Sequence, residues 1–141
     1  MERMSDGEWR EFIMADTRTG KLAVTLRDGH PHVTPVWFVL DGDDVVFTTH
    51  ESSLKGRSLR RYPHAALCVD DQRPPYSFVM LKGRTTLSSE LDDLLMWATI
   101  IGARYMGEDR AVEFGERNGV PGEYLVRLHV EKIIAYRDVA D

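Results

Sequence analysis

The sequence has little cysteine and no long apolar run. Cys68, the one cysteine among 141 residues, lies in the apolar segment 65–69, so it forms no disulfide within the chain. We expect a buried core thiol in a reducing compartment. No segment approaches the roughly 20 apolar residues of a membrane-spanning helix, and residues 1–6 lack the apolar core of a signal peptide. These absences predict a soluble cytoplasmic protein without a membrane partner.

Short motifs of several enzyme classes are also missing. The five histidines are scattered and make no metal-ligand spacing with Cys68, so we expect no metal site. The chain has neither a glycine-rich phosphate loop nor a nucleophile elbow. Catalytic sets are arranged in space, and residue order alone identifies none here. The sequence therefore names no catalytic residue.

Positive charge is too scarce for a general nucleic-acid binder. The formal net charge is −5, from 18 lysines and arginines against 23 aspartates and glutamates. Four of the basic residues gather within the segment 55–61. This local cluster predicts a small anionic ligand and no nucleic-acid partner. The length predicts one domain over residues 1–141, small enough that a roomy ligand site would need a second subunit.

The most informative stretch is residues 45–63, which predicts the end of a strand, a polar turn and a basic helix. Ser52 or Ser53 is a good helix N-cap. Lys55 and Arg57 then fall in or near the first turn, where the helix dipole is positive and a cation is unfavourable. A bound anion would make this arrangement favourable, and free N–H groups, hydroxyls and two cations together describe a phosphate site. A solvated basic helix without a ligand is the alternative.

The remaining periodicity predicts an α+β protein, mainly β. Alternating patterns indicate strands, the first three forming an antiparallel meander, over residues 21–26, 31–40, 45–49, 65–70, 77–87, 123–130 and 133–137. Helices are expected near residues 5–15, 53–62, 90–101 and 108–118. Ser5 and Glu8 match a capping box for the first of these helices, and Ser88 or Ser89 would cap the third. Pro31 and Pro35 place part of the second strand at an edge or a bulge, and Gly83 permits a bulge or a close backbone approach in the fifth. Six or seven antiparallel strands with about four helices predict a closed or nearly closed barrel.

A family resemblance rests on the segment that reads Phe47-Thr48-Thr49, a turn, Ser53-Leu54-Lys55, a helix and then Arg60-Arg61-Tyr62-Pro63-His64-Ala65-Ala66-Leu67. This segment resembles the flavin-phosphate segment of the split β-barrel flavoproteins, the pyridoxamine 5′-phosphate oxidase-like superfamily. Residues 29–38 and 79–84 are similar to the neighbouring strands of that family. The short length, the segment 55–59 and the chain end at 136–138 look most like the deazaflavin branch, which uses coenzyme F420.

The resemblance implies a six- to seven-stranded antiparallel split β-barrel of the FMN-binding type, in a homodimer whose cofactor site lies at the subunit interface. It implies an oxidoreductase that passes a hydride from reduced F420 to an electron-poor small molecule such as an enone, quinone or tetrapyrrole. By the same analogy, Val36 and Trp37 would flank the cofactor ring, and the cofactor phosphate and adjacent groups would be held by Thr49, Ser53, Lys55, Arg57 and Ser58.

Two departures from the family pattern bear on the cofactor. Leu54 stands where FMN-binding oxidases usually carry an arginine beside the lysine, which weakens an FMN phosphate clamp. The chain also lacks the C-terminal extension that holds the substrate phosphate in true pyridoxamine phosphate oxidases, so that activity is not expected. Two alternatives stay open: an FMN-dependent oxidoreductase of the same fold, and a non-catalytic protein that binds or carries F420 or a flavin.

Overall fold

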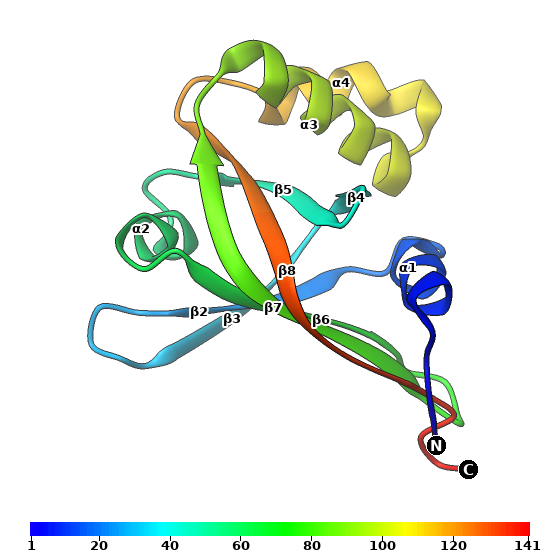
Figure 1. The fold of residues 1–141 in the computed structure, drawn as a ribbon. Coiled ribbons are helices and arrows are strands. Elements are labelled where there is room, and N and C mark those ends of the chain that lie inside the picture. Colours follow the sequence, from blue (N-terminus) through cyan, green and yellow to red (C-terminus); the bar gives the residue numbers. More distant parts are fainter.

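The structure, a computed structural model, describes all 141 residues and consists of one antiparallel sheet with four α-helices around it (Figure 1). The strands are β1 (Glu2–Arg3), β2 (Gly20–Thr25), β3 (Pro31–Val36), β4 (Val39–Asp41), β5 (Asp44–His50), β6 (His64–Asp71), β7 (Ser77–Ser88) and β8 (Glu123–Arg137). The helices are α1 (Asp6–Met14), α2 (Leu54–Arg61), α3 (Leu91–Met106) and α4 (Ala111–Asn118), with a 3₁₀ turn at Glu108–Arg110.

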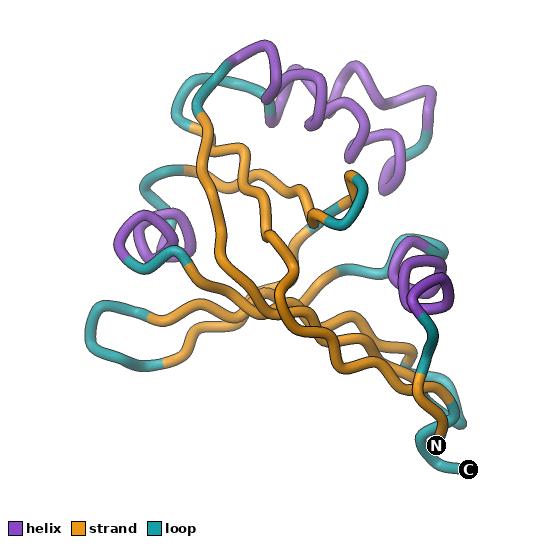
Figure 2. The backbone as a smooth tube through the Cα atoms, viewed as in Figure 1, coloured by secondary structure: helices purple, strands orange, loops and turns teal.

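The sheet curls into a barrel that does not close. Its strands follow the order β3-β2-β6-β7-β8-β5-β4, and β1 pairs with the end of β8. The two ends of this order, β3 and β4, do not pair with each other. The long strands β7 and β8 bend across the molecule and join its two halves (Figure 2). The predicted α+β split barrel is confirmed.

The predicted second strand over residues 31–40 is in fact two strands. It breaks at Trp37 and Phe38, so that β3 pairs with β2 while β4 pairs with β5. The expected meander of three strands is therefore wrong, because the two halves lie at opposite ends of the strand order. The prolines did predict correctly that β3 lies at an edge of the sheet.

The two predicted closing strands are one continuous strand. In β8, Lys132 pairs with Lys82 and Val130 pairs with Gly83, so Glu131 is an extra residue within an unbroken ladder. The Glu131 carboxylate accepts a hydrogen bond from the Arg84 N–H at 2.8 Å, which satisfies the backbone beside this bulge. The extra residue belongs to β8 and not to the fifth predicted strand, so a bulge in that strand is wrong. The close backbone approach expected at Gly83 is confirmed, because a Cβ atom there would meet the carbonyl oxygen of His129.

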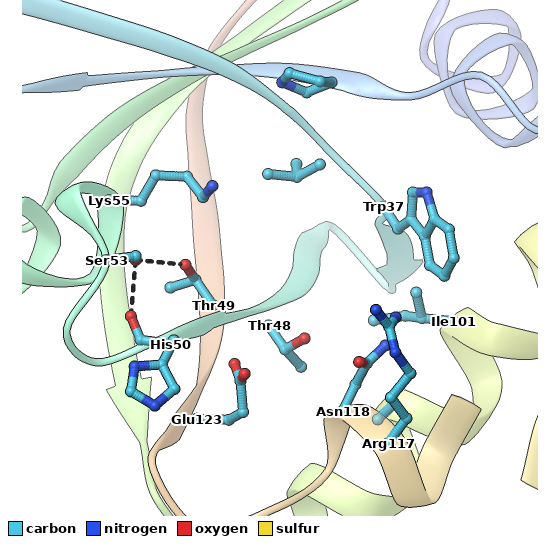
Figure 3. A pocket seen from close by; sticks show the side chains of 13 residues that line it. Trp37, Thr48, Thr49, His50, Ser53, Lys55, Ile101, Arg117, Asn118 and Glu123 are labelled. Carbon is cyan, nitrogen blue, oxygen red and sulfur yellow. Dashed lines mark hydrogen bonds between the residues drawn. The ribbon is translucent and has the colours of Figure 1, made fainter. Parts of the chain in front are cut away.

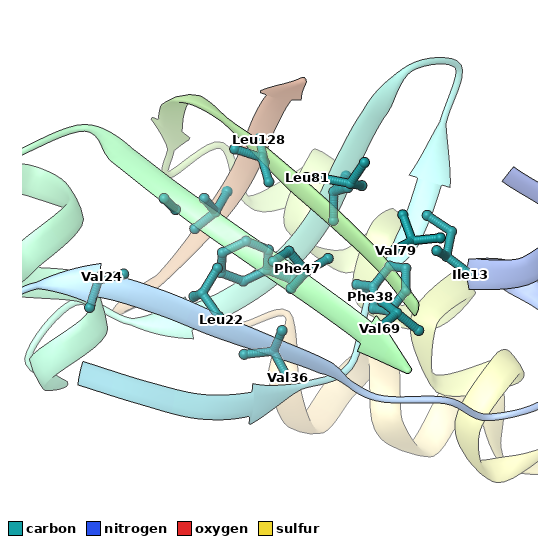
Figure 4. Packing of buried hydrophobic residues seen from close by; sticks show 14 of the residues in the cluster. Ile13, Leu22, Val24, Val36, Phe38, Phe47, Val69, Val79, Leu81 and Leu128 are labelled. Atoms are coloured by element: carbon teal, nitrogen blue, oxygen red, sulfur yellow. The ribbon is translucent and has the colours of Figure 1, made fainter. Parts of the chain in front are cut away.

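Two apolar clusters hold the fold together. The larger has 19 buried residues inside the barrel, among them Phe38, Phe47 and Leu81 (Figure 4). The smaller has five buried residues and joins α3 to the outer side of β4, β5 and β8. Both faces of β5 are therefore buried, which explains its continuous apolar run. The predicted burial of Cys68 is wrong: its thiol is only partly covered, because Leu67 and Val69 take the inward positions of β6.

The N-terminal caps of α1, α2 and α3 were predicted from the sequence, and two of these three predictions are confirmed. Ser5 and Glu8 form the expected capping box of α1, and Ser53 caps α2 through the N–H of Gly56. The serine cap expected for α3 is wrong, because its N-cap is Glu90 and no side chain caps it. None of the helices combines the length and apolarity needed to cross a membrane.

The bulge predicts the effect of a substitution at Gly83. A Cβ atom there would lie 1.8 Å from the carbonyl oxygen of His129, a backbone atom that cannot move without breaking the β7–β8 ladder. We expect Gly83→Ala to lower the free energy of unfolding by about 3 kcal/mol, at the upper end of ordinary substitutions. Urea denaturation measures this loss. Gly7→Ala is the matched control, because nothing lies within 4 Å of its added Cβ atom; equal stability of the two variants would contradict the assignment.

Candidate functional site

A cavity of about 360 Å³ opens where the split in the barrel meets the helices (Figure 3). One wall comes from β3 and the break that follows it, and a second from the end of β5 and the start of α2. Helices α3 and α4 and the start of β8 complete it. The lining residues are Pro35, Val36, Trp37, Thr48, Thr49, His50, Ser53, Lys55, Ala98, Ile101, Arg117, Asn118 and Glu123.

Five of the seven residues that the family resemblance implied meet in this cavity: Val36, Trp37, Thr49, Ser53 and Lys55. The other two do not line it. Arg57 and Ser58 face a separate hollow on the other side of α2, formed with the turn between β2 and β3. Helix α2 therefore borders two hollows. Arg57, two positions from Lys55, lies on another face of the helix, and Ser58 lines the second hollow beside it.

At the α2 end of the cavity, hydroxyl groups are occupied in shaping the turn. The Ser53 hydroxyl donates to the His50 carbonyl oxygen at 2.7 Å and accepts from the Gly56 N–H at 3.0 Å. The Thr49 hydroxyl lies 3.0 Å from it. These two side chains therefore fix the turn, and the donors left for a ligand are the N–H groups of Leu54 and Lys55 at the helix start, which have no acceptor within the helix.

Lys55 points into the cavity from this helix start (Figure 3). Its ammonium group forms no ion pair, and the first turn of α2 contains no acidic residue. A cation beside the positive end of a helix dipole is unfavourable on its own. The arrangement becomes favourable when an anion contacts both, so this end of the cavity suits a phosphate or carboxylate group.

At the opposite end, the wall beside Trp37 is held rigidly. The Trp37 ring stacks on Tyr105 with centroids 5.2 Å apart and planes 6° from parallel. The Tyr105 hydroxyl accepts from the Phe38 N–H at 3.2 Å and donates to the Arg18 carbonyl oxygen at 2.8 Å. Arg104 donates to the carbonyl oxygen of Phe38 at 2.6 Å. The backbone that leaves the sheet at this break thus has its hydrogen bonds satisfied by α3.

The residues that sequence reasoning missed are Thr48, His50, Arg117, Asn118 and Glu123. Glu123 begins β8 directly opposite His50 of β5, a pairing about 70 positions apart that only the sheet register reveals. Arg117 and Asn118 enter the cavity from the last turn of α4 (Figure 3). No local signal could have located them, because they reach the cavity through the packing of α4 on α3.

Glu123 carries the one perturbed carboxyl group of the cavity. Burial raises its pKa above the ordinary value, and the nearby positive charges of His50 and Lys55 only partly oppose this effect. A negative ligand group beside Lys55 would favour the neutral form further. The cavity therefore offers one permanent cation at the α2 end and one carboxyl group whose pKa is raised by burial.

The raised pKa of Glu123 predicts how stability depends on pH. Above the ordinary pKa of a glutamate, the Glu123 carboxyl group is ionised more fully in the unfolded chain than in the folded chain. The free energy of unfolding therefore falls as the pH rises from that ordinary value through the higher pKa of the folded state. We expect Glu123→Gln to raise the melting temperature at pH 7 and to change it less near pH 4. Thermal unfolding at both pH values measures the effect. Glu51→Gln is the control, because it removes an exposed carboxyl group nearby. An equal rise of the melting temperature in both variants, or at both pH values, would show that the raised pKa of Glu123 is not the cause.

Three solved structures have the same fold. A conserved hypothetical protein from Mycobacterium tuberculosis has a TM-score of 0.84 at 23% identity, covering 96% of this chain and 86% of that one. A protein named F420 reductase has a TM-score of 0.69 at 22% identity, with coverage of 87% and 94%. A haem-storage protein from Vibrio cholerae has a TM-score of 0.72 at 17% identity, with coverage of 96% and 98%. At these identities the likeness shows the fold alone.

No curated protein sequence matches the chain. A family model described as pyridoxamine 5′-phosphate oxidase matches residues 5–137, which span all but the ends of the barrel. Together with the open eight-stranded sheet and the cavity at its split, this match shows that the chain belongs to the pyridoxamine 5′-phosphate oxidase family.

Proposed function

We propose that the protein is an oxidoreductase that uses coenzyme F420 and reduces an electron-poor organic molecule. The observation that carries this proposal is the cavity itself, which places an unpaired lysine at a helix start at one end and a rigid aromatic wall at the other. A cofactor with a phosphate group and a flat ring matches this arrangement. The family contains oxidoreductases, and one similar structure is named an F420 reductase.

The residues that line the cavity would hold two parts of such a cofactor, its phosphate group and its ring. Lys55 and the first-turn N–H groups would bind the phosphate, while Thr49 and Ser53 hold the turn that presents them. Val36 and Trp37 would flank the ring. The cavity volume lies near the lower end of the range of about 300–1,000 Å³ for small-molecule sites, so the rest of the cofactor would extend along its open rim. We leave Arg57 and Ser58 out of the proposed cofactor site.

When bound in its reduced form, the deazaflavin supplies a hydride to the substrate, and the protein positions the two against each other and excludes water. The substrate would be an enone, a quinone or a tetrapyrrole. F420 is preferred to FMN because Leu54, at the helix start, offers no second cation to an FMN phosphate. An FMN enzyme and a non-catalytic carrier remain the two alternatives that the experiment below must separate.

The proposal predicts the result of titrating the purified protein with F420 and with FMN while following tryptophan fluorescence. We expect saturable binding of F420 and weaker binding of FMN, because Leu54 gives FMN no phosphate clamp. Tighter binding of FMN would contradict the choice of cofactor. Binding of F420 without turnover of an enone, a quinone and a tetrapyrrole would instead support the carrier.

The role of Lys55 is tested in the same titration. Lys55→Ala should weaken binding of F420 by about 1.5–3 kcal/mol, the range for hydrogen bonds to charged groups, without unfolding the barrel. Arg60→Ala is the matched control, because it removes an exposed cation of the same helix that lines neither hollow. Full affinity in Lys55→Ala would remove Lys55 from the site.

We also propose that the protein is a homodimer with the cofactor site at the subunit interface. The outer face of the sheet formed by β2, β3, β6 and β7 has no helix over it (Figure 1). It presents small and apolar side chains between the inward-facing ones, including Ala23, Ala66 and Met80, and Val33 is 59% exposed. Strand β3 carries both Val33 and the cavity residues Pro35 and Val36, so a subunit docked on this face would border the cavity.

The dimer proposal predicts a change of mass in solution. Light scattering coupled to size-exclusion chromatography should give twice the chain mass of 16.1 kDa, and Val33→Asp should shift the protein toward the monomer, since it places a charge on the docking face. Val112→Asp serves as the control, because Val112 is 66% exposed on α4, away from that face. A monomeric parent protein, or an equal shift in both variants, would contradict the proposal.

A further inference from the structure

A second hollow, of about 420 Å³, lies on the side of α2 that faces away from the cofactor cavity. It forms between α2 and the turn that joins β2 to β3, which Figure 1 shows beside each other. Its walls carry three arginines, one from the turn and two from the helix, together with a serine and two leucines: Arg27, Arg57, Arg61, Ser58, Leu26 and Leu54. Below we call this the arginine hollow.

The three arginines form no ion pair within the chain, although one acidic residue, Asp28, lines the hollow with them. Helix α2 itself contains no acidic residue. Arg57 and Arg61 are four positions apart on the helix, a spacing at which like charges destabilise it. The one acidic residue of the hollow, Asp28, accepts hydrogen bonds from the backbone N–H of His30 at 3.0 Å and lies 3.1 Å from its ring nitrogen Nδ1. The hollow therefore keeps a positive excess that an anion would neutralise.

Ser58 is a second, independent sign of a ligand. The residue is only 2% exposed and borders the arginine hollow, and its hydroxyl oxygen is not fully enclosed. The hydroxyl group makes no hydrogen bond within the chain, although a helical serine commonly bonds to the carbonyl oxygen four residues earlier. Polar groups buried to this extent usually have a partner. A ligand oxygen in the hollow would supply the partner that Ser58 lacks.

We propose that the arginine hollow binds a phosphoryl group, separately from the cofactor cavity. Arg57 and Arg61 would contact its oxygens through their planar guanidinium groups, which suit phosphate geometry, and Arg27 would close over it from the turn. The Ser58 hydroxyl would donate to one oxygen. Leu26 and Leu54 form an apolar wall for the organic part of a phosphate ester. The site requires no flavin, so it stands whether or not the proposed function does.

Calorimetric titration tests this site with two probes, inorganic phosphate and phenyl phosphate, in a phosphate-free buffer of low salt. Arg57→Ala and Arg61→Ala should each raise the dissociation constant about tenfold, the value for losing a hydrogen bond to a charged group. Ser58→Ala should raise it about fivefold while leaving the charge unchanged. Arg60→Ala is the control, because it removes an equal charge outside the hollow and should change binding less than twofold.

Each outcome of the titration either supports or contradicts phosphoryl binding in the arginine hollow. Tighter binding of phenyl phosphate than of inorganic phosphate identifies a phosphate ester as the ligand, and equal binding identifies free phosphate; both support the site. No binding of either probe, or an equal loss in Arg60→Ala and Arg57→Ala, would mean that only a diffuse positive field exists, and the proposal would fall. It would also fall if Ser58→Ala bound both probes normally. A loss of F420 or FMN affinity in Ser58→Ala as large as in Lys55→Ala would overturn the separation of the two sites.

Discussion

The break between β3 and β4 is the constraint on which the rest of the structure depends. A chain that leaves a sheet exposes backbone N–H and C=O groups, and burying them without partners is costly. Here Tyr105 and Arg104 of α3 bind both backbone groups of Phe38. These contacts satisfy the backbone at the point where one segment passes from β3 to β4, strands at opposite ends of the sheet order. The cavity opens at the split in the barrel, with Trp37 fixed beside it by stacking on Tyr105.

Helix α2 supplies the second constraint through its charge. Its four basic residues face solvent or hollows without any acidic residue on the helix, although the whole chain is acidic. Such an uncompensated helix is better suited to binding anions than to stabilising the fold by itself. Because Lys55 and Arg57 point to opposite sides, the helix serves the proposed cofactor cavity on one side and the arginine hollow on the other.

Family membership and structural likeness establish the fold of this chain, but they do not establish which ligand it binds. The similar structures include a protein named for F420 reduction and one named for haem storage, so the same barrel serves different chemistry. The ligand therefore has to be argued from the side chains at the split. In this chain those side chains combine one unpaired lysine, a carboxyl group whose pKa is raised by burial and an aromatic wall. Of these features, the proposed function uses the lysine for the cofactor phosphate and the aromatic wall for the cofactor ring.

The sequence by itself determined the local elements: the capped helix starts at Ser5 and Ser53, the close backbone approach at Gly83, the edge position of β3 and the basic helix beside a strand end. These follow from backbone preferences and charge over a few residues. Only the tertiary structure decided that residues 31–41 divide between two sheet ends, that β8 continues past Glu131, that His50 meets Glu123 and that Lys55 and Ser58 serve different hollows. The reason is physical: each of these depends on partners tens of residues away, whose hydrogen bonds and packing outweigh local preference.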